Sequence, residues 1–406
     1  MDSNKTTQIE NLNDLNAEEK TQLQDCISRD YTTPPHKETR LDTRDSSIEL
    51  LRILSMLMIV AHHIVFHGGI LDNSGGNIAK IICGGIFIPG GKIGFDCFIF
   101  ISAWFMSSKA FSGNRYIKIA LETIFYNILG MALAALLNNG LIAPITWQNW
   151  IGCFLPLFGI SHGFAIYYLI FLIILPFLQK ATENMSKINI ISIVILLFMM
   201  QLGSSIIAKL IDFDYKQFTD VTIGLTTFII IYFLSVYLHK YPLKITDSKL
   251  IMSVVFILIW IIFATVNILS EKYPENNIFS LIFAVIGSEI SPLNIIAGIC
   301  IFFLFKNIRI KNIKAINFIA SHTFGILLLH DHNYFRYIIW ERVFGVSKVY
   351  PANALIQLAY TIIVALIVFA AGVLIDIIRK YLLEKPLTKT KLYSKACDLL
   401  EKCFNF

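Results

Sequence analysis

Charged residues are scarce in this sequence. They make up 15% of its 406 residues, whereas hydrophobic residues make up 56%. A soluble domain keeps roughly a quarter of its residues charged, so the composition excludes an ordinary water-soluble fold. The formal net charge of +6 is spread between apolar runs instead of forming one patch. Because basic residues in such places orient membrane spans, they do not indicate a nucleic-acid partner.

Cysteine patterns that bind metal are also missing. The seven cysteines form no Cys-x-x-Cys pair and no Cys/His cluster, so no metal site is predicted. Most of them lie in the tails or in apolar runs, where a thiol behaves as a small hydrophobe. A disulfide between Cys83 and Cys153 stays open, since both are expected to face outward but nothing fixes their distance.

The first 47 residues lack the apolar content of a folded core. They hold ten acids and six bases, which predicts a disordered cytoplasmic tail over residues 1–47. They also lack the basic, apolar and small-residue order of a cleaved signal peptide.

The rest of the chain consists of long apolar runs, each able to cross a hydrocarbon layer about 30 Å thick. The runs are continuous and do not alternate as barrel strands do, so helices are the predicted spanning elements. We therefore predict an all-α integral membrane protein with about ten transmembrane helices. Segment 147–160 is shorter and contains Pro156, so it is expected to be re-entrant or interfacial. The predicted spans are centred on 48–68, 91–109, 116–138, 164–180, 190–209, 221–239, 250–270, 281–306, 314–333 and 354–379.

The charges of the connections predict the orientation. The four short connections that follow spans two, four, six and eight contain twelve Lys and Arg residues. The five other connections, most of which are longer, contain eight. Since cytoplasmic loops carry the excess of Lys and Arg, the denser set is predicted to be cytoplasmic. Both termini are then cytoplasmic, and 381–406 is a short cytoplasmic C-terminal segment.

Ionisable residues are concentrated in the first span. Each costs a few kcal/mol at the centre of a membrane helix, so such residues tend to be functional. Arg52 and His63 are eleven residues apart, which places them within about 20° around a helix and about 16 Å apart along it. His62 points about 100° away from His63. The span also contains Glu49 and His67.

Arg52 and His63 suggest an anion site below a general base. A guanidinium near the cytoplasmic surface suits a phosphate-bearing donor, and a neutral imidazole toward mid-membrane can take a proton. The alternative is that Arg52 only reaches lipid headgroups and that the histidines bond neighbouring helices. Two adjacent histidines on the helix of Arg52 favour the functional interpretation.

Polar residues also enter later spans. Asp96 either orients His63 or caps its own helix, and Ser102 lies further along the same span. His330 lies inside the ninth span, where a second imidazole could bind or deprotonate an acceptor at the external side. Asp331 beside it fits either that role or a simple interfacial cluster.

Three strings carry a family resemblance: IELLRILSMLMIVAHH, GKIGFDCFIFISAWFM and SHTFGILLLHDH. Together they resemble the membrane acyltransferase-3 family, and more closely its branch associated with O-acetylation of bacterial surface polysaccharides. Arg52 and His63 match the family pattern of arginine, ten residues and histidine. The family pattern in the second span is met by Gly94, Asp96, Phe98 and Ser102, with Ala103 in place of the usual glycine. The family pattern in the ninth span is met by Phe324, Gly325 and His330. A basic motif is partly met by Arg115 and Lys118.

The resemblance covers about residues 48–380 and implies a membrane acyltransferase domain there. It implies O-acyl transfer, most simply acetyl transfer, from cytosolic acetyl-CoA or another acyl-CoA to a hydroxyl of a cell-surface or lipid-linked glycan. The protein would be multi-pass in the bacterial cell membrane, with the bilayer, the donor, the glycan and polysaccharide-synthesis proteins as partners. The implied residues are His63, Arg52 and Asp96 for catalysis, Arg52, Arg115 and Lys118 for the donor, and His330, Ser102 and His62 for the substrate.

A proton-coupled transporter or flippase is the rival class, with the histidines relaying protons and Arg52 binding an anion. Transporters often contain internal repeats, and the Arg52-to-His63 pattern has no second copy in the sequence. Hydrolysis of a thioester by the purified protein would support the enzyme, and substrate flux without acyl transfer would support the carrier.

Overall fold

A computed structural model describes residues 44–73, 77–157, 163–210, 216–273, 277–288, 290–308 and 310–405. One compact unit begins at Asp45, and residues 1–43 of the predicted tail lie outside the described residues. The first helix begins at Ser46, ahead of the predicted domain start at residue 48. The reason is the Asp45 side chain, which accepts a hydrogen bond from the backbone N–H of Ser47 at 2.9 Å and so caps the helix.

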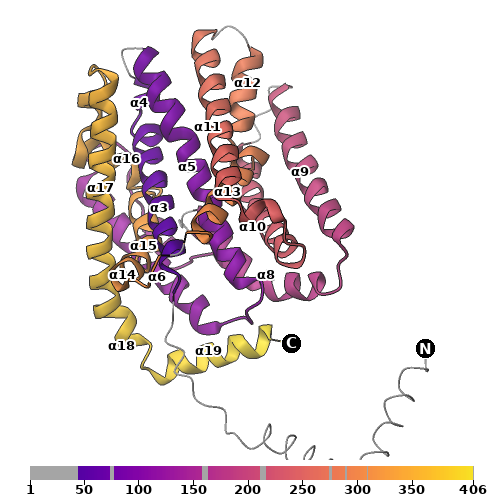
Figure 1. Cartoon of the computed structure of the whole chain (residues 1–406). Helices are drawn as coiled ribbons and strands as arrows, with labels where there is room; N and C mark the ends of the chain where they lie inside the picture. The colour runs from indigo at the N-terminus through magenta and orange to yellow at the C-terminus, as the bar shows by residue number, and fades with distance from the viewer. Residues whose placement is uncertain are drawn as a thin grey trace, which may run out of the picture. The chain divides into compact units, whose positions relative to one another are not determined.

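The described residues of this unit form helices and no strands, as predicted (Figure 1). The principal helices are α3 (Ser46–His67), α5 (Asn77–Met106), α6 (Gly113–Leu137), α8 (Gly163–Thr182), α9 (Lys187–Leu210), α10 (Lys216–Lys240), α11 (Lys249–Lys272), α12 (Asn277–Ile286), α13 (Pro292–Lys306), α15 (Thr323–His330), α17 (Ala354–Arg379) and α19 (Lys391–Phe404). Shorter helical pieces are α4 (Ile70–Asn73), α7 (Trp147–Gly152), η1 (Lys244–Asp247), α14 (Lys314–Ala320), α16 (Arg336–Ile338), η2 (Ile339–Phe344), η3 (Val346–Val349), η4 (Lys380–Glu384) and α18 (Lys385–Leu387).

Six of the described helices are long and apolar enough to cross a membrane, namely α3, α5, α6, α8, α11 and the helix that starts at Ala354. Three more apolar stretches are shorter: Lys187–Gly203, Gly224–Lys240 and Pro292–Lys306. The multi-pass helical character is therefore confirmed, and the number of about ten spans stays a prediction.

The second helix is longer than the sequence predicted. It was expected to start at residue 91, but α5 starts at Asn77 and continues through Pro89. Beyond Pro89, the bare backbone of Gly91 lies against the side chain of His62, where a Cβ would find no space. Close approach through a small residue is a common way to pack membrane helices. Lys92, one of the eight Lys and Arg that the charge pattern assigned to the longer connections, lies inside α5 instead.

Two predicted spans are each divided into two helices. The run 281–306 breaks between α12 and α13, where the Asn294 side-chain amide donates to the carbonyl oxygens of Ile286 and Ser288 at 3.1 and 2.8 Å. The run 314–333 breaks between α14 and α15, where Lys380 Nζ donates to the Ser321 carbonyl at 2.6 Å. Side-chain donors thus satisfy carbonyls released by the breaks, as burial in an apolar layer requires.

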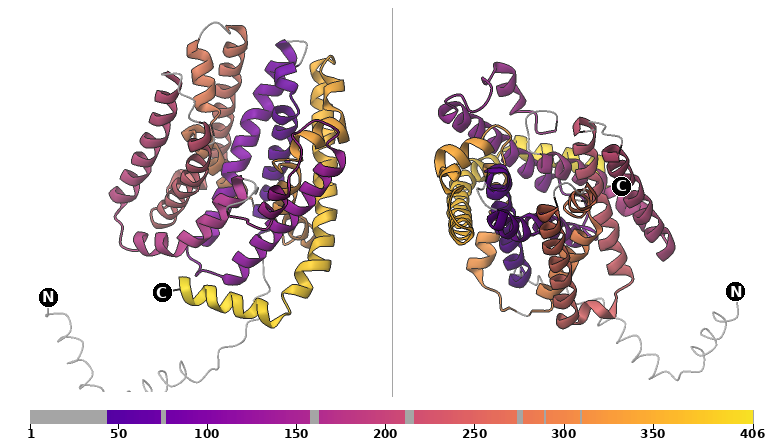
Figure 2. Two further views of the ribbon diagram at one scale, coloured as in Figure 1. Left: turned by 180° about the vertical axis from the view of Figure 1, so that it is seen from behind. Right: turned by 90° about the horizontal axis from the view of Figure 1, so that it is seen from above.

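Helix α3 lies among α5, α13, α14, α15 and α17 (Figure 2). Most of its residues are buried, so its side chains meet protein on several sides. A membrane helix that is covered in this way can hold polar side chains away from lipid. The position of α3 therefore fits the concentration of ionisable residues in it.

The lysine-rich connections lie at one end of the bundle. Ser46 Oγ donates to Asn317 at 2.9 Å, Asn307 Nδ2 to the Thr246 carbonyl at 2.7 Å, and Lys240 Nζ to the Glu183 carbonyl at 2.9 Å. The first bond joins the start of α3 to α14, the second joins the connections after α13 and α10, and the third joins the end of α10 to the connection after α8. The grouping is the one that the charge pattern predicted, and its placement in the cytoplasm stays a prediction.

The C-terminal helix α19 packs at the same end. Its Glu401 accepts a hydrogen bond from the backbone N–H of Gly113 at 2.9 Å, at the start of α6. Tyr393 donates to the Asn114 side chain at 2.6 Å. Burial raises the pKa of Tyr393 to about 12, so this phenol stays a donor at neutral pH. Residues 391–404 are therefore part of the compact unit. Cys83 and Cys153 are free thiols, so no disulfide joins them.

Candidate functional site

The two adjacent histidines of α3 face different neighbours. His62 is 5% exposed and lies against α5, with Nδ1 at 3.3 Å from the Phe87 carbonyl oxygen. His63 faces α15 instead, and its Nδ1 lies 3.0 Å from Nε2 of His330. The helical geometry that separated the two residues in the sequence thus gives them separate surroundings.

The hydrogen bonds of His330 determine which nitrogens carry protons. His330 Nδ1 lies 2.6 Å from the carbonyl oxygen of Ile326, which can only accept, so Nδ1 carries the hydrogen. In neutral His330 the other nitrogen, Nε2, then accepts, and the hydrogen of the His63–His330 bond belongs to His63 Nδ1. Neutral His63 therefore has its remaining lone pair on Nε2, as a general base needs.

Three further polar side chains complete this site. Oδ1 of Asp331 lies 3.8 Å from His63 Nδ1, 3.7 Å from His67 Nε2 and 3.5 Å from Arg336 Nη1. His67 follows His63 by one helical turn and so shares its face of α3. We call His63, His67, His330, Asp331 and Arg336 the outer cluster. It lies toward the C-terminal end of α3, opposite the lysine-rich connections.

Donor atoms of His63, His67 and Asp331 lie within 4.8 Å of one another, a grouping that a metal ion could use. The guanidinium of Arg336 already supplies positive charge at the same carboxylate oxygen. Two cations at one oxygen would repel each other, so the arrangement favours the ion pair over a metal. The absence of a metal site stays a prediction.

Trp340 adds a buried donor beside His330. Its ring centroid lies 6.1 Å from that of His330, and the residue is 1% exposed. Within the described part of the chain, its indole N–H has no hydrogen-bond partner. A buried donor without a partner costs about 1–3 kcal/mol, so a bound oxygen atom would be stabilised if it reached this N–H. Trp340 belongs to η2, a π-helical turn of the kind often found at functional sites.

Two predicted site residues of α5 face other parts of the molecule. Asp96 is 1% exposed and lies against α13, where a Cβ on Gly298 would be 3.3 Å from the Asp96 Cβ. Ser102 donates to the Phe98 carbonyl of its own helix at 3.2 Å. The roles predicted for Asp96 and Ser102 stay predictions.

The three basic residues predicted to bind the donor lie at or near the lysine-rich end. Arg52 Nε pairs with Glu49 at 3.2 Å, and its guanidinium carbon lies 5.6 Å from the Phe98 ring centroid. Lys118 Nζ lies 3.3 Å from Glu384. The backbone N–H of Arg115 donates to the Ser112 side chain at the start of α6. These residues and His63 are at different depths, so a donor would have to reach along the bundle to the outer cluster.

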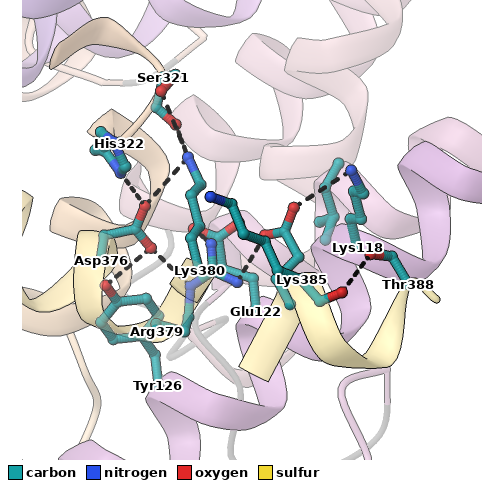
Figure 3. A network of polar contacts seen from close by, with 12 residues as sticks. Lys118, Glu122, Tyr126, Ser321, His322, Asp376, Arg379, Lys380, Lys385 and Thr388 are labelled. Carbon is teal, nitrogen blue, oxygen red and sulfur yellow. Dashed lines mark hydrogen bonds and ion pairs between the residues drawn. The ribbon is translucent and has the colours of Figure 1, made fainter. Parts of the chain in front are cut away.

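A second buried cluster lies near that end and is shown in Figure 3. Asp376 is fully buried and is bonded by His322 Nδ1 at 2.6 Å and Arg379 Nε at 2.7 Å. Arg379 is also within 3.4 Å of Glu122. We call this the Asp376 network; its members are Lys118, Glu122, Tyr126, His322, Asp376, Arg379, Lys380 and Glu384.

Sequence reasoning missed some of the residues gathered around His63. His67 was detectable, because histidines four residues apart share a helical face. Arg336 and Lys92 were counted only as loop charges, although Lys92 lies close enough to interact electrostatically with His63 and His67. No local pattern marked Trp340, whose place depends on how the chain turns after α15.

Comparison with known proteins gives the family. No curated protein and no solved structure is detectably similar to the chain. A family model described as an acyltransferase domain matches residues 45–376, which is most of the chain and includes the whole outer cluster. With its apolar helices and this match, the chain belongs to the acyltransferase-3 family and is a multi-pass membrane acyltransferase.

Proposed function

We propose that the protein transfers an acyl group, most simply acetyl, from cytosolic acyl-CoA to a hydroxyl of a cell-surface or lipid-linked glycan. One observation carries the proposal: His63 Nδ1 donates to Nε2 of His330 at an N···N distance of 3.0 Å, and the Ile326 carbonyl fixes the tautomer of His330. His63 Nε2 is then the lone pair that takes a proton from the acceptor.

The reaction needs one base that later acts as an acid. His63 Nε2 removes the proton from the acceptor hydroxyl while that oxygen bonds to the thioester carbon. Collapse of the tetrahedral intermediate breaks the carbon–sulfur bond, and the proton on Nε2 passes to the leaving thiolate. The products are the glycan ester and free coenzyme A, so atoms and charges balance.

The depth of His63 supports a reaction that serves the far side of the membrane. His63 lies seventeen residues after the start of α3, or about 26 Å along the helix axis. The thioester of a cytosolic donor would therefore travel most of the way across the bilayer. Arg52, Arg115 and Lys118 lie nearer the donor side, where cationic groups suit the phosphates of coenzyme A.

The test uses purified protein in proteoliposomes. Acetyl-CoA is added on one side, and free thiol release and ester formation on an added glycan are measured. Thiol release that depends on His63 supports the enzyme. Glycan movement between compartments without thiol release or ester formation would contradict the proposal and support a flippase.

A further inference from the structure

The outer cluster leads from His63 toward the surface through an ion pair. The exposed fraction of the side chains rises in steps: His63 15%, Asp331 20%, Arg336 27%. Tyr337, the next residue, is 47% exposed. Because this path lies at the end opposite the lysine-rich connections, it is separate from the residues predicted to bind the donor.

The chemistry of this path fits neighbouring hydroxyl groups. A carboxylate only accepts hydrogen bonds and a guanidinium only donates them, and here the two lie 3.5 Å apart. A hydroxyl both donates and accepts, so two adjacent hydroxyls could serve Asp331 and Arg336 at the same time. Since the opposite charges of Asp331 and Arg336 lie side by side, a carboxylate or an ammonium on the acceptor would be attracted by one and repelled by the other, and so would gain no net attraction from the pair.

An aromatic side chain stands beside the pair. The Tyr337 ring meets the His67 ring edge-on, with centroids 5.8 Å apart, and lies 5.3 Å from the Arg336 guanidinium carbon. The face of an aromatic ring carries partial negative charge, which attracts weakly positive C–H groups. A ring with polar edges and C–H faces, such as a pyranose, matches a surface of this kind.

We propose that Asp331 and Arg336, with Tyr337 beside them, form the subsite that binds the acceptor sugar through adjacent hydroxyls. This deepens the proposed function and rests on it. His67 contacts both Asp331 and Tyr337 and so holds the subsite against α3. The sugar hydroxyl to be acylated is then presented to His63, which shares Asp331 as a neighbour.

The test changes one charge at a time and measures selectivity. Octyl glucoside and octyl glucuronide serve as a neutral and a negatively charged acceptor, with acetyl-CoA as donor. The ratio of kcat/KM for the two acceptors is measured in the wild-type protein, in Asp331→Asn and in Arg336→Gln. Because the ratio is taken within each variant, a difference in the amount of folded protein cancels.

The two variants should shift the ratio in opposite directions. Asp331→Asn should favour the glucuronide by at least about tenfold and Arg336→Gln should disfavour it similarly, since a unit charge a few ångströms away is worth well over tenfold at an effective dielectric constant near 20. Arg342→Gln is the matched control, because Arg342 is an exposed arginine bound to the Asn139 carbonyl. Its ratio should equal the wild-type value.

Shifts of the same sign, or no shift in either variant, would overturn the subsite. Thiol release by the wild-type protein without ester formation on either acceptor would also overturn it, while leaving acyl-CoA chemistry intact. The absence of both thiol release and ester formation would instead contradict the proposed function itself, and the subsite would fall with it.

Discussion

The outer cluster and the Asp376 network lie at opposite ends of one short helix. His322 is the N-cap residue of α15 and belongs to the Asp376 network, and His330 is the last residue of α15 and belongs to the outer cluster. Asp376 is bonded at 2.6 and 2.7 Å. In the outer cluster, three nitrogen atoms lie at 3.5 to 3.8 Å from Oδ1 of Asp331. The two ends of α15 thus hold the same residue types, each around a different aspartate.

We assign different roles to the two clusters: the Asp376 network stabilises the fold, and the outer cluster carries the proposed reaction. Buried charges cost free energy unless partners satisfy them, and the ion pairs of the Asp376 network join three carboxylates to three cations: Glu122, Asp376 and Glu384 to Lys118, Arg379 and Lys380. Removing one charge from such a buried network leaves an opposite charge without compensation. The outer cluster instead includes His63, whose Nε2 lone pair is the one that the proposed reaction uses.

The largest expected effect is on catalysis at His63. His63→Ala removes the proposed base, which typically costs a factor of about 10²–10⁴ in rate. His62→Ala should keep substantial activity, because His62 faces Phe87 and Gly91 of α5 and not His330. Acyl transfer is measured for both variants at matched membrane abundance. An inactive His62→Ala beside a near-normal His63→Ala would contradict the assignment of the base.

The next largest effect is on stability at Asp376. Asp376→Asn leaves three cations with two carboxylates, and breaking a buried ion pair typically costs about 3–5 kcal/mol. We expect a lower unfolding temperature and less folded protein in the membrane. Lys180→Gln is the control, because its pair with Glu183 is exposed and should contribute less than about 1 kcal/mol. Equal stability of the two variants would show that the Asp376 network is not the stabilising element.

A smaller effect is expected at His330, which positions His63. Loss of a partner that orients a histidine typically costs about 10- to 100-fold in the best-studied sites, those with metals. His330→Gln should retain more activity than His330→Ala, because a glutamine oxygen can still accept the His63 Nδ1 hydrogen. The rates and pH profiles of both variants are compared. Equal rates for the two would indicate that His330 only fills space.

The sequence was sufficient to predict the helical membrane fold and the grouping of the lysine-rich connections. Both depend on composition and on the spacing of apolar runs, which are local properties. It was not sufficient to predict where helices break. At the break before α15, Lys380 bonds to the Ser321 carbonyl, and these residues are 59 positions apart. Likewise His62 of α3 packs on Gly91 of α5, a contact between two helices that no local pattern marks.

The sequence likewise predicted only part of the candidate site. Helical periodicity distinguished His63 from His62, since both lie on one helix and 100° per residue separates their faces. The pairing of His63 with His330 was not predicted, because it crosses 267 positions of sequence. Arg336 could not be distinguished from an ordinary loop charge, as only the turn after α15 brings it to Asp331. Long-range contacts therefore account for what the sequence left out.

The smallest expected effect concerns Arg52, which lies outside both clusters. Its guanidinium pairs with Glu49 and lies near the Phe98 ring, and it is about 16 Å along α3 from His63. Arg52→Lys keeps the charge but loses the planar fork that binds phosphate through two hydrogen bonds. We expect KM for acyl-CoA to rise by about tenfold, the value of one good hydrogen bond to a charged group, with kcat little changed because the outer cluster is untouched. KM for a pantetheine thioester, which lacks the nucleotide phosphates, should not change. An unchanged KM for acyl-CoA would remove Arg52 from the donor site, and a fall in kcat alone would mean that α3 transmits a change at its start to His63.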